Sequence, residues 1–291
     1  MEKEKAIALN NEGARHFLNQ AFDRAISCYE QALELDPGNS SILNNLGLYH
    51  HQQKEFKKAL GFFEKAIQID SKPSYLVNSG NALAMMGVFP QARESYIEAL
   101  KQDPHHESAR VSLAHLALHT GNHDEAIGIW KKILARSNDT AHVIQLAKVY
   151  MKIQNWEKAL QQLHSIPATV GDSLAWFMIG QCEFQLKNHG LAEKAFKMAL
   201  AEDPDHTKIR QHLAINYLAM GQWESGIKHL SAILRLEPGN YQVMTELAVV
   251  YLGRGDQKEA ADWLEKALNL KPDFSKALHY RKILAQSQAQ Q

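Results

Sequence analysis

Apolar residues recur along this chain with the spacing of an amphipathic helix, and the pattern is clearest between residues 173 and 204. Two helical runs of similar length are separated there by a polar, turn-prone stretch at residues 187–190. The second run ends at Pro204, because proline cannot donate the next helical hydrogen bond. The stretch predicts two helices joined by a tight turn. We expect them to cross at Gly180 and Ala192, where small side chains let two backbones approach closely.

The same two small residues recur through nearly the whole chain, and neighbouring copies are always 33 or 34 residues apart. The first column consists of Gly13, Gly47, Gly80, Ala114, Ala147, Gly180, Ala214 and Ala248. The second consists of Ala25, Ala59, Ala92, Ala126, Ala159, Ala192, Gly226 and Ala260. Closing prolines follow at Pro37, Pro104, Pro204, Pro238 and Pro272. Two columns with identical steps indicate an internal repeat of eight units.

This unit, with its small, aromatic and proline positions, resembles the tetratricopeptide repeat family over about residues 6–272. The resemblance implies an all-α fold: a right-handed superhelical solenoid of about eight helix-turn-helix repeats with a C-terminal capping helix. We expect about seventeen helices. The repeats are predicted at 6–39, 40–72, 73–106, 107–139, 140–172, 173–206, 207–240 and 241–274, the capping helix at 275–286 and a polar tail at 287–291. Phe274, Leu278, Ile283 and Leu284 are expected to cover repeat eight.

A mostly aromatic column marks the predicted turn inside each hairpin. Its members are Phe22, Phe56, Phe89, His123, Trp156, His189, Trp223 and Gln257. We interpret this column as packing that closes the hairpin rather than as a binding feature. Glycines are expected to supply the left-handed backbone that ends the first helix in four repeats, at Gly87, Gly121, Gly221 and Gly255.

Repeats four and five depart from the pattern because neither has a closing proline, and Pro167 interrupts the second helix of repeat five. A loop is predicted at 168–172. Stability in such an array is a sum of repeat and interface terms, so the weakest interface opens first. We therefore predict the earliest local opening between about residues 135 and 172. The equal alternative is that these repeats have only tolerated drift of their sequence and are no weaker than the others.

Charge and composition narrow the function. Lys plus Arg and Asp plus Glu are both 32, so the net charge is zero, which argues against a nucleic-acid-binding protein. The chain has neither an apolar signal-peptide core near its start nor a run long enough for a membrane span. A cytoplasmic location is the expectation, with a trimmed exported protein as the alternative. Cys28 and Cys182 lie five repeats apart and are expected to act as small apolar side chains rather than as a disulfide.

The resemblance implies that the first helices line a concave groove, and asparagines recur on them in repeats one to three. Asn11, Asn45 and Asn78 share one inward position. A carboxamide both donates and accepts, so such a row can bond the backbone of an extended peptide, and it resembles the asparagine ladder of the O-linked N-acetylglucosamine transferase. The alternative is that asparagine is simply common at this position. The peptide-binding candidates here are Asn10, Asn11, Asn44, Asn45, Asn78 and Asn81. Since Asn11, Asn45 and Asn78 are polar and on a groove surface, we expect these three to contribute little to folding.

Beyond repeat three the predicted groove becomes more apolar. The candidates there are His115, Lys148, Phe177, Gln181 and Phe184. Exposed apolar groups in a groove suit the side chains of a partner, but these residues could equally cover one another.

Two other binding modes have weaker support. A carboxylate clamp, which this family uses for the C-terminal tails of chaperones, would need lysine and arginine at positions where repeats one to three have none. His115 and His119 are four residues apart and could share a zinc ion, but a site needs further ligands, and Asp124 and Glu125 lie on the next helix. We therefore expect no metal and no cofactor.

No glycine-rich phosphate loop, cysteine cluster or nucleophile-with-base arrangement stands out, so we expect no enzyme. The sequence favours a non-catalytic interaction scaffold that binds an extended segment or helix of another protein, with no nucleic acid and no membrane insertion. The alternatives are a repeat arm of a larger enzyme or of a secretion or assembly complex, and a scaffold that self-assembles through its terminal repeats.

Overall fold

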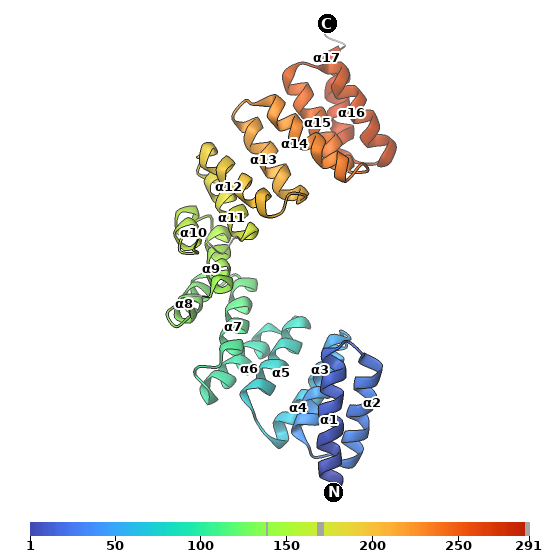
Figure 1. Cartoon of the computed structure of the whole chain (residues 1–291), viewed down its shortest axis with the longest axis vertical. Helices are drawn as coiled ribbons and strands as arrows, with labels where there is room; N and C mark the ends of the chain where they lie inside the picture. Colours follow the sequence, from blue (N-terminus) through green and yellow to red (C-terminus); the bar gives the residue numbers. More distant parts are fainter. Residues whose placement is uncertain (138, 168–171, 289–291) are drawn as a thin grey trace. The chain divides into compact units, whose positions relative to one another are not determined.

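The computed structural model describes residues 1–137, 139–167 and 172–288. Within these residues the chain forms seventeen α-helices and no β-strand (Figure 1), which confirms the all-α fold class. Position 138, residues 168–171 of the predicted loop and residues 289–291 of the predicted tail lie outside the described residues. None of the described helices is long and apolar enough to cross a membrane.

The chain divides into two compact units, Met1–Val149 and Tyr150–Gln291, and the division falls inside α9 (Thr140–Lys152). The first unit contains α1 (Glu2–Leu18), α2 (Phe22–Leu35), α3 (Ser40–Gln52), α4 (Phe56–Ile69), α5 (Pro73–Met85), α6 (Phe89–Gln102), α7 (Glu107–His119) and α8 (His123–Leu134). The second contains α10 (Trp156–Leu163), α11 (Ser173–Gln185), α12 (His189–Glu202), α13 (Thr207–Ala219), α14 (Trp223–Leu236), α15 (Tyr241–Arg254), α16 (Gln257–Leu270) and α17 (Ser275–Gln288).

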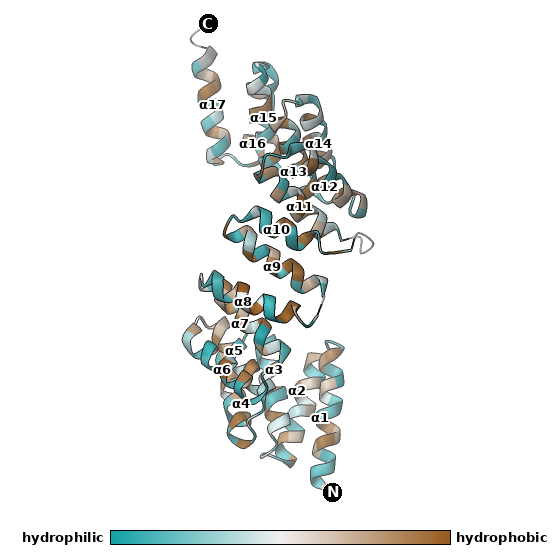
Figure 2. Ribbon diagram, turned by 90° about the vertical axis from the view of Figure 1, so that its left-hand side faces the viewer, coloured by the Kyte–Doolittle hydropathy of each residue, from teal (hydrophilic) through white to brown (hydrophobic). Residues whose placement is uncertain are grey.

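Every second helix begins at a residue of the predicted turn column, from Phe22 at the start of α2 to Gln257 at the start of α16. Within each unit a helix contacts its hairpin partner, as α1 contacts α2, and the second helix then contacts the next first helix, as α2 contacts α3. Most helices carry both hydrophobic and hydrophilic residues (Figure 2), as expected where one face packs and another meets solvent. The second helices thus begin at the positions that the repeat pattern predicts.

Each hairpin turn contains one residue with left-handed backbone. The four predicted glycines are among them, with φ values from 71° to 89°. The other four hairpins have a non-glycine residue there, Gln20, Lys54, Gln154 or Lys187, with φ between 58° and 64°. A Cβ makes this conformation unfavourable, so these four turns are strained where the glycine turns are not.

Both columns of small residues are buried, as predicted for a helix crossing. The space beside them is filled by large side chains of the second helices; Tyr29, Phe63, Tyr96, Trp130 and Phe196 are among the largest fully buried side chains of the described chain. Each hairpin therefore contributes one bulky side chain to the core of its own unit.

Repeat five has the short second helix that Pro167 predicts. Helix α10 has eight residues and ends at Leu163, whereas the other second helices have twelve to fourteen. The opening predicted between residues 135 and 172 stays a prediction, and positions 138 and 168–171 within it lie outside the described residues.

Helix α17 covers repeat eight. Leu284 is buried in one apolar cluster with Leu264 and Leu268 of α16, and Phe274 and Leu278 pack against that cluster. Ile283 is 40% exposed, and its expected contact with repeat eight stays a prediction.

Candidate functional site

The asparagines of the first three repeats bond one another across repeats. Asn45 Nδ2 donates to Asn10 Oδ1 at 2.9 Å, and Asn78 Nδ2 donates to Asn44 Oδ1 at 2.8 Å. The two acceptors are buried, with 9% and 8% exposure, whereas Asn11 is exposed. These bonds tie α1 to α3 and α3 to α5, so the row links the first helices of unit 1.

This arrangement differs from the expectation that the asparagines contribute little to folding. If the Asn78 carboxamide were removed, Asn44 Oδ1 would lose its donor in a buried position, which is unfavourable. Binding capacity remains nevertheless. A carboxamide has two N–H donors and two acceptor positions, and each donor asparagine uses one N–H for its neighbour.

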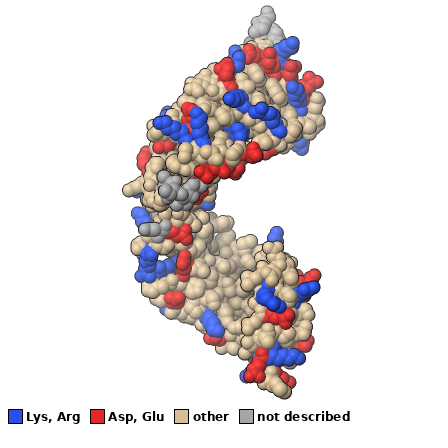
Figure 3. All heavy atoms as spheres, viewed as in Figure 1, with Lys and Arg blue, Asp and Glu red and all other residues tan. Residues whose placement is uncertain are grey.

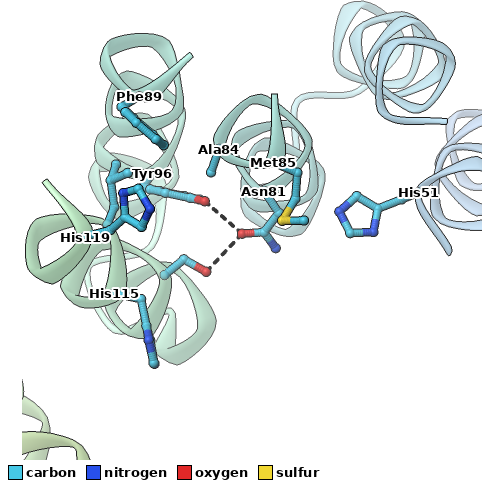
Figure 4. Close-up of a pocket in the computed structure, with 10 residues that line it drawn as sticks. His51, Asn81, Ala84, Met85, Phe89, Tyr96, His115 and His119 are labelled. Carbon is cyan, nitrogen blue, oxygen red and sulfur yellow. Dashed lines mark hydrogen bonds between the residues drawn. The ribbon is translucent and has the colours of Figure 1, made fainter. Parts of the chain in front are cut away.

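Asn81 has a different role from the rest of the row. Its Oδ1 accepts two hydrogen bonds, from the Tyr96 hydroxyl at 2.8 Å and from the Ser112 hydroxyl at 3.1 Å. Both donors bond to the same oxygen, so the carboxamide is fixed in one orientation. Figure 4 shows the result: the amide nitrogen of Asn81 points away from the two hydroxyls, toward the side of Met85 and His51.

The Asn81 carboxamide lies in a pocket of about 500 Å³ formed by α3, α5, α6 and α7 of unit 1. Its apolar wall includes Met85, which is 61% exposed, and Phe89, whose ring centroid is 4.8 Å from that of His119 (Figure 4). The lining residues are His51, Asn81, Ala84, Met85, Phe89, Tyr96, Ser112, His115, Leu116 and His119.

The pKa values of three titratable residues of this pocket are shifted toward their uncharged forms. Desolvation by the surrounding protein lowers the pKa of His51 and of His115, and the nearby Lys148 ammonium lowers that of His115 further. Burial raises the pKa of Tyr96 to about 12, and a hydrogen bond with Ser112 opposes that effect. Charged side chains of both signs are interspersed elsewhere on the face in Figure 3. The pocket thus favours uncharged groups.

The other predicted site residues are not gathered at this pocket, apart from His115. Lys148 is exposed on α9. Phe177 is 7% exposed and lies in the core of unit 2, 5.0 Å from the His212 ring and 6.0 Å from the Phe196 ring between centroids. Beyond repeat three the apolar candidates were expected either to face a groove or to cover one another. Phe177 is covered by its neighbours. Gln181 and Phe184 are half-buried, and Phe184 packs against the same core.

Sequence reasoning missed most of the pocket. Tyr96 and Phe89 belong to repeat positions that pack hairpins, and Ser112 lies at the position where the asparagine row stops. The available signal was Met85 followed by Met86, two methionines at the end of a first helix, where several other repeats have a polar residue, as at Gln52 and Lys152.

Comparison with known proteins identifies the family. A family model described as tetratricopeptide repeat matches residues 14–74, and one described as "Cilia and flagella-associated protein 70 C-terminal domain" matches residues 90–291. A curated relative, the BBSome complex member BBS4 of Bos taurus, is 25% identical over 127 residues, which are 43% of this chain and 24% of that protein. The chain thus spans about a quarter of the length of this relative.

Solved structures agree on the fold. The crystal structure of the APC/C hetero-tetramer Cut9–Hcn1 aligns with a TM-score of 0.55 and 21% identity, over 90% of this chain and 52% of that chain. The crystal structure of MamA protein aligns with a TM-score of 0.52 and 23% identity, over 57% of this chain and 92% of that chain. Identities this low show the fold alone. Because the second family model covers more than two thirds of the sequence, this chain belongs to the family of the cilia and flagella-associated protein 70 C-terminal domain, a tetratricopeptide repeat family.

Proposed function

We propose that this chain is a non-catalytic scaffold that binds an extended segment of a partner protein along the first helices of repeats one to four. An uncharged, apolar side chain of the partner enters the pocket between α3, α5, α6 and α7. The observation that carries this proposal is the fixed Asn81 carboxamide, whose amide nitrogen faces a pocket that also has the apolar side chains of Met85 and Phe89.

Asn81 supplies the polar contact. With its oxygen occupied by Tyr96 and Ser112, it offers N–H donors, and these suit the backbone carbonyl of an extended peptide. Met85 supplies the adaptable contact, because an unbranched thioether side chain fits apolar groups of varied shape. The pair thus recognises backbone and apolar side chain together, without demanding one sequence.

The asparagine row extends this surface toward the N-terminus. Asn45 and Asn78 each retain one N–H beyond the bond to the neighbouring repeat, and Asn11 is exposed. Since the bonded pairs hold their carboxamides in place, little side-chain entropy is lost when a peptide binds them.

The second candidate is a repeat arm of a larger protein or assembly. It is supported by the relatives, one of which is named a member of a complex and one of which was solved within a hetero-tetramer, and by the part-length match to both. The cytoplasmic location and self-association through terminal repeats remain predictions of the sequence.

A peptide-display experiment tests the pocket. Short linear peptides displayed on phage are selected on the purified chain, and fluorescence anisotropy then measures the affinity of the enriched peptides for two variants. Met85→Glu places a charge at the pocket wall and should weaken binding by roughly tenfold or more, because the bound peptide desolvates that charge. Met198→Glu, at a methionine of similar exposure on α12, should leave affinity unchanged. If no peptide is enriched, or if both variants bind alike, the proposed pocket is wrong.

A further inference from the structure

Three potential metal ligands meet in the first hairpin, and none of them lines the pocket around Asn81. Glu12 and His16 are four residues apart on α1 and therefore share one helix face. Cys28 faces them from α2. The nearest ligand atoms of the three residues all lie within 4.8 Å of one another, and no second group of three such side chains is this close among the described residues.

The spacing of these atoms is close to that of a tetrahedral metal site. His16 Nε2 and Glu12 Oε1 are 3.6 Å apart. Nitrogen and oxygen ligands bind zinc at about 2.0–2.1 Å, which puts two of them roughly 3.3 Å apart in a tetrahedron. A zinc-bound sulfur, at about 2.3 Å from the metal, would be roughly 3.5 Å from either ligand atom, so each distance from Cys28 Sγ has to shorten by about 1.3 Å at most.

The internal repeat shows that these residues are exceptional. The positions equivalent to Glu12 hold Leu46, Ser79, Leu113, Leu146, Ile179, Leu213 and Leu247. Those equivalent to His16 hold His50, Leu83, Ala117, Tyr150, Glu183, Tyr217 and Tyr251. Those equivalent to Cys28 hold Phe62, Ser95, Ile129, Gln162, Ala195, His229 and Trp263. Repeats two to eight have at most one metal-ligating residue at these three positions, whereas repeat one has three.

We propose that Glu12, His16 and Cys28 bind a zinc ion, with water as the fourth ligand. A thiolate and an imidazole favour zinc over magnesium or calcium, which prefer oxygen ligands. The thiolate and the carboxylate together carry two negative charges and balance the dication. The Arg15 guanidinium competes with the zinc ion for the Glu12 carboxylate. This ion pair is weak, because Arg15 Nη2 lies 3.7 Å from Glu12 Oε1 at the exposed surface.

The ion would join the two helices of the first hairpin. Two ligands come from α1 and one from α2, so zinc binding adds its free energy to the stability of that hairpin. The site needs no contribution from the pocket around Asn81, and its test is therefore independent of the proposed function.

Cobalt titration of the purified, reduced chain tests the site, because tetrahedral Co²⁺ reports its ligands by absorption. We expect one Co²⁺ per chain, intense visible d–d bands and a thiolate-to-cobalt charge-transfer band, all displaced by Zn²⁺. Cys28→Ala should remove the charge-transfer band. His16→Gln and Glu12→Gln should each weaken Co²⁺ binding by more than roughly tenfold, because losing a ligand costs more affinity than losing a residue that only supports a ligand, and the latter already costs about tenfold.

The matched control is Cys182→Ala, which removes the other cysteine and should leave the spectrum unchanged. Circular dichroism verifies that each variant is folded. Zinc should also raise the melting temperature of the wild type and of Cys182→Ala, but not of Cys28→Ala. An absent charge-transfer band, or one that survives Cys28→Ala, would overturn the proposal.

Discussion

The ring of Phe196 occupies the space that a side chain at Gly180 would need: a Cβ built on Gly180 would be 2.5 Å from Cδ1 of Phe196. A Cβ on Gly13, Gly47 or Gly80 would be about as close to the ring sixteen positions later, and in the sequence a large residue follows every first-column residue at this spacing. Glycine is paired with Phe or Tyr in four repeats, and alanine is paired with Leu or Trp in the other four. The pairs are Gly13–Tyr29, Gly47–Phe63, Gly80–Tyr96, Gly180–Phe196, Ala114–Trp130, Ala147–Leu163, Ala214–Leu230 and Ala248–Leu264.

Gly180→Ala should lower the free energy of unfolding by about 1–3 kcal/mol, because the fully buried Phe196 ring has to shift. Phe196→Leu alone should also destabilise, but the double variant should lose less than the sum of the two, since it recreates the Ala–Leu pair of repeats seven and eight. Urea denaturation of all three variants measures this coupling. The control is Gly190→Ala in the same hairpin, where a Cβ meets nothing within 4 Å and stability should stay level or rise by up to about 1 kcal/mol. Strict additivity would contradict the pairing.

Asn78→Ala should destabilise by about 1–3 kcal/mol, because the buried Asn44 Oδ1 loses its donor. Asn11→Ala, at the exposed end of the row, should change stability by less than about 0.5 kcal/mol. Thermal unfolding followed by circular dichroism compares the two. Equal small effects would show that the bonds between repeats add nothing to the fold.

Lys187→Gly should stabilise the chain by about 1 kcal/mol. Its backbone has φ 64° in the turn before α12, a conformation in which any Cβ is unfavourable. Gly221, with φ 71°, holds the same place in the next hairpin, so Gly221→Ala should destabilise by a similar amount. Chemical denaturation of both variants measures the sign of each change in unfolding free energy. A loss of stability in Lys187→Gly would show that the turn at Lys187 is not strained.

Stability should fall as the pH drops below the ordinary range of histidine. Burial, and secondarily the Lys208 charge, lower the pKa of His212 in the folded state, so the unfolded chain binds more protons between the folded pKa and about 6.5. The stabilisation is therefore complete above about pH 6.5 and is lost as the pH falls through that window. His212→Gln should flatten the dependence of unfolding free energy on pH between about 7.5 and 5.5. An unchanged slope would exclude His212 as a source.

The fold followed from the sequence because each unit repeats the same steric requirement. The small residues, the turn column and Pro167 locate the crossings, the start of every second helix and the short α10. A period of this kind averages over eight copies, so single departures such as Gln257 in an aromatic column do not obscure it.

The candidate site was harder to predict because it depends on contacts between repeats. The sequence places Asn44 and Asn45 side by side, but not which of them bonds forward and which backward. The sequence also does not distinguish an aromatic residue of a first helix that faces a groove from one that faces a core. Phe177 faces the core, where it packs against Phe196 and His212.

The pairing of Gly180 with Phe196 has a consequence for how such a chain can be rearranged. A first helix with glycine needs an aromatic partner, so grafting α11 in front of α16 would leave a void beside Leu264, and grafting α15 in front of α12 would force Ala248 into Phe196. Whole hairpins can be duplicated, deleted or exchanged with their internal fit intact, whereas single helices can move only between repeats of the same kind. The unit of recombination in this chain is therefore the hairpin.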